Sequence, residues 1–193
     1  YAGLLDGLQG LQDLVSEGHV PTMAPFMRHM RLLVELTAER GMVLRHMCLA
    51  RPSTDTDAGV QQVACRSFLA VQIGHANGLD RSSLMSLGLA SILDLITRDT
   101  EPSKVMTKVA PYTTLSDLTP KVMMILRAFQ LARRGKRTDH FGQLLLLLDT
   151  FVETIHGPEP ATLEDVRSQL GWTTGADTEV LEVVLEWLGD KPV

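Results

Sequence analysis

Several residue types and patterns are scarce in this chain of 193 residues. The only cysteines are Cys48 and Cys65, and no CxxC pair occurs, which excludes a disulfide framework and argues against a thiolate zinc site. The formal net charge of −5 lacks the basic surplus with which nucleic-acid-binding proteins neutralise phosphates. The longest aliphatic run, Leu144–Leu148, has five residues, whereas a bilayer-spanning helix needs about 20. We therefore expect a reduced, cytoplasmic protein with no nucleic-acid partner and no membrane insertion.

The short motifs of common catalytic sites are also missing. The sequence contains no HExxH, no glycine-rich phosphate loop and no GxSxG. Ser82, Ser83 and Ser86 have no base near them in sequence and are expected to cap or line a helix. The histidines are scattered and are expected to lie on the surface or to be partly buried: His19, His29, His46, His75, His140 and His156. No cofactor and no metal site is predicted from these patterns.

What the chain does have is aliphatic residues at helical spacing. Hydrophobic residues make up 45% of the chain and aromatic residues only 5%, so aliphatic and Met side chains must fill the core. Leu4, Leu8, Leu11 and Val15 recur at intervals of three and four, the period of an amphipathic helix. Helices are expected over 3–17, from Phe26 to a break at Gly41, over 60–76, 82–96, from Thr119, and over 141–155, 162–170 and 180–187. No strand alternation is found, so the predicted fold class is all-α.

A polar, turn-rich stretch at 51–59 marks the best internal boundary. It separates an N-terminal helical extension, residues 1–48, from a domain at 49–193. The extension carries more apolar surface than so short an appendage can bury alone. We therefore expect it to pack on the domain or on a second copy of the chain, which would give a homodimer.

A basic cluster surrounds Gly135 and contains Arg133, Arg134, Lys136 and Arg137. The first interpretation is a solvated loop between two helices. The second is a site for phosphates or an acidic partner, since grouped positive charges attract anions. Both interpretations stay open from the sequence alone.

Several stretches between Leu49 and Val193 resemble one known family. Leu87–Leu93 is similar to a segment "LGLAALL", Leu118–Pro120 to a helix start "LTPEE", and Phe141–Phe151 to "FSRIVAVADAY". The tail Leu188–Val193 resembles "LLGxYPV". These stretches come in the order found in the HD-GYP family of cyclic di-GMP phosphodiesterases. The resemblance implies an HD-domain-like helical bundle, here preceded by the N-terminal extension.

The same resemblance implies that the metal ligands of the family are mostly lost. Family members hydrolyse a phosphodiester with two or three metal ions held by histidines and aspartates. Ungapped extension of the resemblance places these ligands on Gln62, Asp94, Leu95, Phe129 (or Met123 if the register slips) and Asp149. Only Asp149 keeps its residue type, and Asp94 stands where a histidine belongs. We expect the two carboxylates either to be satisfied by hydrogen bonds, for instance with Gln62, or to form a surviving metal site.

Three functions follow from the resemblance. The leading hypothesis is a pseudoenzyme that acts as a protein-interaction or scaffold component in bacterial signalling, with no catalytic residue and no cofactor. The second is a receptor that binds cyclic di-GMP without cutting it, through Arg127 and the cluster at 133–137. The third is a residual phosphodiesterase with one metal at Asp94 and Asp149.

Overall fold

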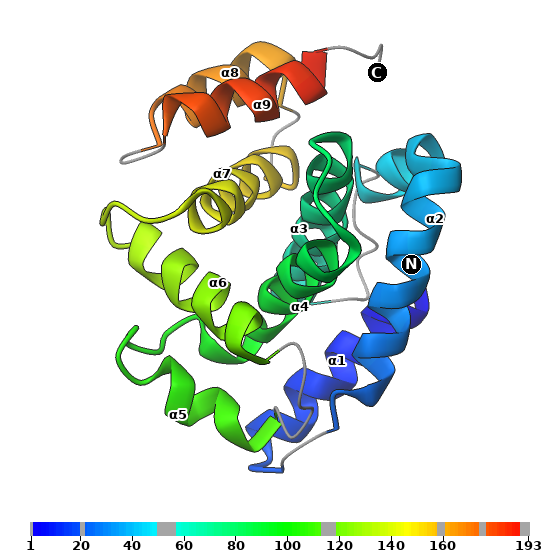
Figure 1. The fold of residues 1–193 in the computed structure, drawn as a ribbon, viewed down its shortest axis with the longest axis vertical. Helices are drawn as coiled ribbons and strands as arrows, with labels where there is room; N and C mark the ends of the chain where they lie inside the picture. Colours follow the sequence, from blue (N-terminus) through cyan, green and yellow to red (C-terminus); the bar gives the residue numbers. More distant parts are fainter. Residues whose placement is uncertain are drawn as a thin grey trace.

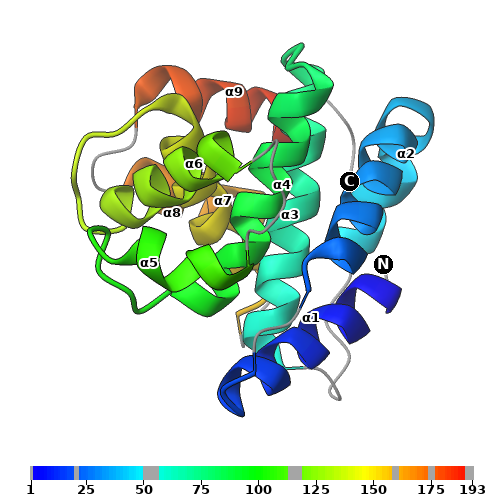
Figure 2. The ribbon, with the colours of Figure 1, turned by 60° about the horizontal axis from the view of Figure 1, so that its bottom comes forward.

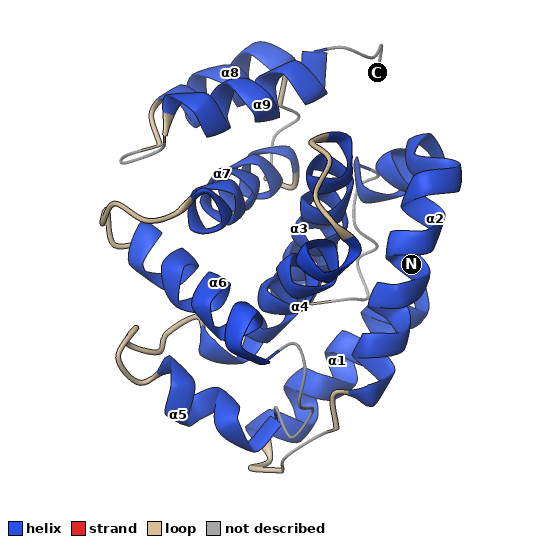
Figure 3. Ribbon diagram, viewed as in Figure 1, coloured by secondary structure: helices blue, strands red, loops and turns tan. Residues whose placement is uncertain are grey.

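The protein is built from helices throughout the part of the chain that can be described. The computed structural model describes residues 2–19, 22–49, 57–112, 119–157, 161–173 and 177–189, with backbone only for 40–49, 112, 119, 163, 188 and 189. Within these ranges no strand occurs, as Figure 3 shows. The elements are α1 (Ala2–Ser16), α2 (Ala24–Leu49), α3 (Ala58–Ala76), α4 (Arg81–Thr97), α5 (Val105–Val109), the 3₁₀-helix η1 (Ala110–Tyr112), α6 (Thr119–Ala132), α7 (His140–Ile155), α8 (Leu163–Gly171) and α9 (Thr178–Gly189). The predicted all-α class is confirmed. Across the same ranges, none of the helices combines the length and apolar character needed to cross a bilayer.

The helix ends follow the local sequence signals. Asp80 and Asp139 cap α4 and α7 by accepting hydrogen bonds from the backbone N–H groups of Ser83 and Gly142. Thr162 and Asp165 form the reciprocal pair of hydrogen bonds of a capping box at the start of α8. Such caps satisfy backbone groups that the first turn of a helix leaves without an internal partner.

Two expectations about helix limits are wrong. Gly41 does not interrupt the second helix, because α2 continues to Leu49. A glycine inside a helix costs only about 1 kcal/mol relative to alanine, which neighbouring residues can offset. The stretch between Pro102 and Pro111, where no helix was among those expected, contains α5 and the start of η1.

The helices α3 and α4 form the centre of the molecule (Figure 1). α6 and α7 contact them from one side, while α1 and α2 contact them from the other. α8 and α9 pack on α7. At one point α6 and α7 are in backbone contact, since a Cβ at Gly142 would lie 2.8 Å from the carbonyl carbon of Ala128. This close approach fixes the two helices that carry half of the site described below.

The N-terminal helices join the same apolar core as the central pair. Leu4, Leu8 and Leu11 of α1 are buried, and so are Met30 and other residues on the inner face of α2. Met30 reaches α4 at Gly88, where a Cβ would lie only 2.5 Å from its sulfur. Figure 2 shows α1 and α2 side by side along α3. The extension therefore packs on the domain, one of the two expected arrangements. Most of the predicted boundary, residues 51–56, lies outside the described ranges.

Candidate functional site: a buried charge cluster

Four charged side chains meet in the interior between α3, α4, α6 and α7. They are Arg66, Asp94, Arg133 and Asp149, and together we call them the buried charge cluster. The side chains of Arg66 and Asp94 are fully buried, and those of Asp149 and Arg133 are 9% and 15% exposed. Ionised groups in an apolar interior must be paired, so the contacts among the four decide whether the arrangement is stable.

Arg66 connects the two carboxylates. Its Nη2 donates to Asp94 Oδ2 at 2.7 Å, and its Nη1 donates to Asp149 Oδ1. Nε donates to Ser91 Oγ at 3.0 Å, and Nη2 also donates to the Ser91 carbonyl at 3.1 Å. Every nitrogen of the guanidinium therefore donates to an oxygen of α4 or α7. The planar fork of arginine suits such a role because its donors point in fixed directions.

Arg133 connects the same two carboxylates from the end of α6. Its Nη1 donates to Asp94 Oδ1 at 2.7 Å. Its Nε and Nη2 donate to Asp149 Oδ2 at 3.0 and 2.7 Å. Gln130, one turn earlier, donates to Asp94 Oδ1 at 2.8 Å. All four carboxylate oxygens thus accept hydrogen bonds, and each carboxylate binds both guanidinium groups.

Phe129 lies against both arginines. The guanidinium carbon of Arg66 is 4.8 Å from the ring centroid and that of Arg133 is 4.1 Å away. A cation over an aromatic face is attracted by the ring quadrupole, most strongly where water is absent. Phe129 itself is fully buried. The ring therefore contacts both guanidinium groups and helps to hold them in place.

The charges of the cluster stabilise one another. Burial alone would raise the pKa of Asp149, but Arg66 and Arg133 outweigh burial, and the pKa lies below its ordinary value of 3.8. Burial would lower the pKa of Arg133, but Asp94 and Asp149 outweigh burial and raise the pKa above its ordinary value. Both groups are therefore ionised at neutral pH.

At its outer edge the cluster continues to the surface through Arg98. This side chain lies 3.7 Å from Asp149 Oδ1 and 3.2 Å from Glu153 Oε1, and it donates to Gln62 Oε1 at 3.4 Å. Partial burial and the neighbouring Asp149 charge raise the pKa of Glu153 above 4.5. Gln62 therefore reaches the carboxylates only through Arg98, and the expected hydrogen bonds from Gln62 to Asp94 or Asp149 are replaced by those of Arg66 and Arg133.

The arrangement does not fit a metal ion of the kind that the family resemblance implies. Metal ligands must offer lone pairs, yet the oxygens of Asp94 and Asp149 already accept hydrogen bonds from two cations. In the ranges that the structure covers, no group of three or more His, Cys, Asp or Glu side chains is placed to hold a metal. Phe129 and Leu95 have no donor atom to offer. The arrangement is suited to bridging four helices, because its charged groups bind one another.

The structure brings only some of the residues chosen from the sequence together. Asp94, Asp149 and Phe129 meet in the cluster, and Gln62 lies at its edge. Leu95 packs against the apolar core, and Met123, the alternative to Phe129, is buried elsewhere in that core. Sequence reasoning missed Arg66, one helical turn after Gln62 on α3. The signal was present, because Arg66 is the only charged residue between Ala58 and Gly74.

The predicted basic cluster is divided by the structure. Arg133 was expected either to lie in a solvated loop or to contact an anion or a partner, and both interpretations are corrected for this residue, because its guanidinium is turned inward onto Asp94 and Asp149. Arg134, Lys136 and Arg137 are exposed, and so is Arg127. Arg127 and Arg137 line a surface hollow of about 520 Å³ together with Met106 of α5 and apolar residues of α6.

Comparisons with protein-family models, with curated proteins and with solved structures each give no match. The resemblance to the HD-GYP family therefore stays a prediction from the quoted stretches. The function has to be argued from the residues of this chain.

Proposed function

We propose that the chain is a non-catalytic HD-GYP-like module that acts as a protein-interaction or scaffold component in bacterial signalling. One observation carries the non-catalytic part. Asp94 and Asp149, the two carboxylates that the resemblance assigns to metal positions, each bind the guanidinium groups of Arg66 and Arg133. Two fixed cations thus take up the oxygens that catalytic metals would need.

The interaction part rests on the surface. Because the side chains of the buried charge cluster bind one another, a partner would contact exposed side chains instead. Met106, Met124 and Trp172 are large, apolar and exposed. Exposed apolar side chains that gather around hollows are typical of protein–protein contact sites. Met106 and Met124 both line the hollow next to Arg127.

A binding role for cyclic di-GMP is the second candidate, because Arg127 and Arg137 lie in that hollow. A ligand that binds only the folded protein raises its unfolding temperature. A rise with cyclic di-GMP that is lost in the Arg127→Glu/Arg137→Glu variant would replace the scaffold proposal with the receptor.

The experiment that tests the non-catalytic proposal combines metal analysis with an activity assay. Purified protein is measured by inductively coupled plasma mass spectrometry and is then incubated with cyclic di-GMP and Mn²⁺ or Fe²⁺. We expect metal far below one ion per chain and no cleavage product. Near-stoichiometric metal, together with cleavage that disappears in Asp149→Ala, would overturn the proposal and make the chain an enzyme.

A further inference from the structure

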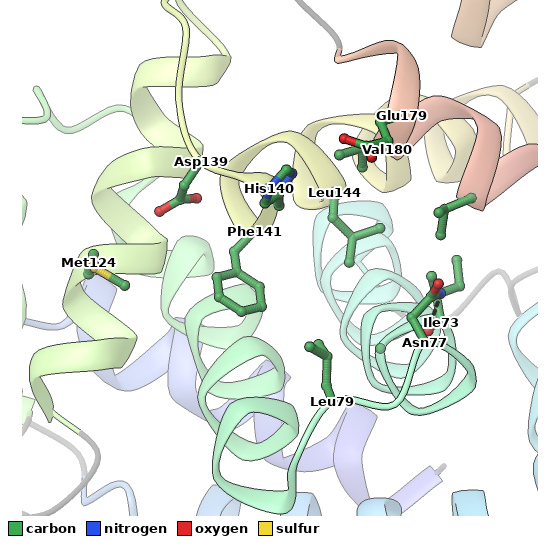
Figure 4. Close-up of a pocket in the computed structure, with 12 residues that line it drawn as sticks. Ile73, Asn77, Leu79, Met124, Asp139, His140, Phe141, Leu144, Glu179 and Val180 are labelled. Atoms are coloured by element: carbon green, nitrogen blue, oxygen red, sulfur yellow. Dashed lines mark hydrogen bonds between the residues drawn. The ribbon is translucent and has the colours of Figure 1, made fainter.

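A second hollow lies next to the one lined by Arg127 and Arg137. It has a volume of about 640 Å³ and is walled by α3, α6, α7 and α9, with Ile73, Phe141, Leu144 and Val180 among its apolar lining residues. Figure 4 shows Met124 and Asp139 on one side of this hollow and Glu179 and Val180 on the other. Its walls are predominantly apolar, as in sites that exclude water from a bound group.

The two hollows meet. Met124 and Asp139 line both of them, so the two hollows adjoin across α6, and we call them together the groove. Met124 is 52% exposed and Met106, farther along, is 51% exposed. Met123 lines the smaller hollow beside Met124. Methionine side chains are flexible and polarizable, and for this reason they suit apolar surfaces that adapt to a partner helix.

The charges along this groove are separated by sign. Arg127 and Arg137 line only the end next to α5, and Glu179 lines only the end at α9. Asp139 lies between them but already accepts the hydrogen bond that caps α7, and His140 beside it is the remaining titratable lining residue of the larger hollow. Lys121 lies over the Phe141 ring and donates to Ser83 Oγ, so its charge is engaged between α4 and α6.

We propose that this groove binds an amphipathic helix of another protein, with acidic residues of the helix at Arg127 and Arg137 and a basic residue at Glu179. Helices that dock in grooves insert apolar residues spaced three and four apart and orient themselves by charges at the groove ends. The apolar lining and the opposite charges at its two ends match this pattern. The proposal rests on the scaffold function, for which it names the surface and the chemistry of the partner.

A peptide selection tests the groove. A display library of peptides of about 16 residues, roughly four helical turns, is selected against the whole chain. We expect the selected sequences to converge on apolar residues at helical spacing, with acidic residues at one end and basic residues at the other. Met124→Glu should weaken their binding about tenfold or more, as for a central contact of an interface.

Leu32→Glu on α2 is the matched control. Leu32 is 50% exposed, nearly the same as Met124, but it lies on the opposite side of α3 and α4. This variant should bind the selected peptides as the wild type does. Convergent peptides that bind Met124→Glu normally would overturn the groove while leaving a protein-interaction function intact. A selection with no convergent binder would overturn the groove as well.

The charge direction has its own test. Arg127→Glu/Arg137→Glu should weaken binding of a selected peptide, and replacing the acidic residues of that peptide by lysine should restore binding to the variant. Equal loss for both peptides would contradict the proposed direction. The metal and hydrolysis assays judge the non-catalytic proposal separately, since neither depends on the groove.

Discussion

The central helices α3 and α4 are held on their two sides by different kinds of contact. On the side of α1 and α2 the contacts are apolar, with Leu8 and Met30 fully buried and an exposed ion pair between Glu35 and Arg81 at the rim. On the side of α6 and α7 the buried charge cluster adds two cations and two anions to the apolar contacts. Apolar contacts tolerate small shifts, whereas charge pairs in the interior require every partner in place. The two sides should therefore respond differently to substitution and to pH.

Removing one cation from the cluster should have the largest effect. Arg66→Met keeps much of the side-chain volume but leaves Asp94 and Asp149 with a single buried counter-charge. Breaking a buried ion pair in this way costs about 3–5 kcal/mol, which urea unfolding at neutral pH would measure. Arg134→Met, at an exposed position, is the control and should change stability by no more than about 0.5 kcal/mol. A loss below about 1 kcal/mol for Arg66→Met would contradict the role of the cluster.

A cavity on the other side should have the next largest effect. Leu8 of α1 is fully buried in the apolar core, so Leu8→Ala removes packed methyl groups and should cost about 2–4 kcal/mol. Leu14→Ala on the same helix, where Leu14 is 40% exposed, should cost clearly less. Equal losses for the two variants would show that α1 does not pack on the domain in solution.

Acidification should weaken the contacts on the side of α6 and α7, where Asp149 lies, and not those on the side of α1 and α2. We expect this effect on stability to be smaller than those of the two substitutions above. The pKa of Asp149 is lower in the folded protein than its ordinary value of 3.8 because Arg66 and Arg133 outweigh the effect of burial. Its contribution to stability is complete above that value and is lost as the pH falls through the folded pKa. Leu8→Ala leaves Asp149 in place, so below pH 3.8 this variant should lose stability as steeply as the wild type does.

Asp149→Asn should lose stability less steeply than the wild type in that acid range. Asp80 and Asp165, whose pKa values are also lowered by hydrogen bonds from Ser83 and Thr162, remain and leave part of the slope. Urea unfolding as a function of pH would measure all three proteins. An unchanged slope in Asp149→Asn would refute the assignment to this carboxyl.

The sequence was sufficient for most of the helices because their signals are local. Aliphatic spacing places most helix ends within a few residues, and the capping residues Asp80 and Thr162 stand at the observed starts of α4 and α8. The resemblance also selected Asp94, Asp149 and Phe129, which do meet. The partners of the two carboxylates could not be derived in the same way, because Arg66 and Arg133 lie 83 and 16 residues from Asp149 along the chain.

Pairings over such distances depend on how the helices pack, which periodicity within one helix does not report. One pattern could still have indicated them. Arg66, Asp94 and Asp149 are each the single charged residue of a long apolar stretch, at 58–74, 82–97 and 141–152. A lone charge among buried residues requires a partner, so three such charges of mixed sign favour a shared buried cluster. Arg133 offers no such signal, because it stands among other basic residues.

The buried charge cluster also affects the electrostatic potential outside the protein. Its two arginines and two aspartates sum to zero, so the formal net charge of −5 belongs entirely to the rest of the chain. Opposite charges packed this closely cancel within a few ångströms, and salt screens what remains beyond about 8–10 Å. The interior therefore exerts no long-range pull on a phosphate or any other ion. Recognition at a distance is left to the outward-facing charges alone.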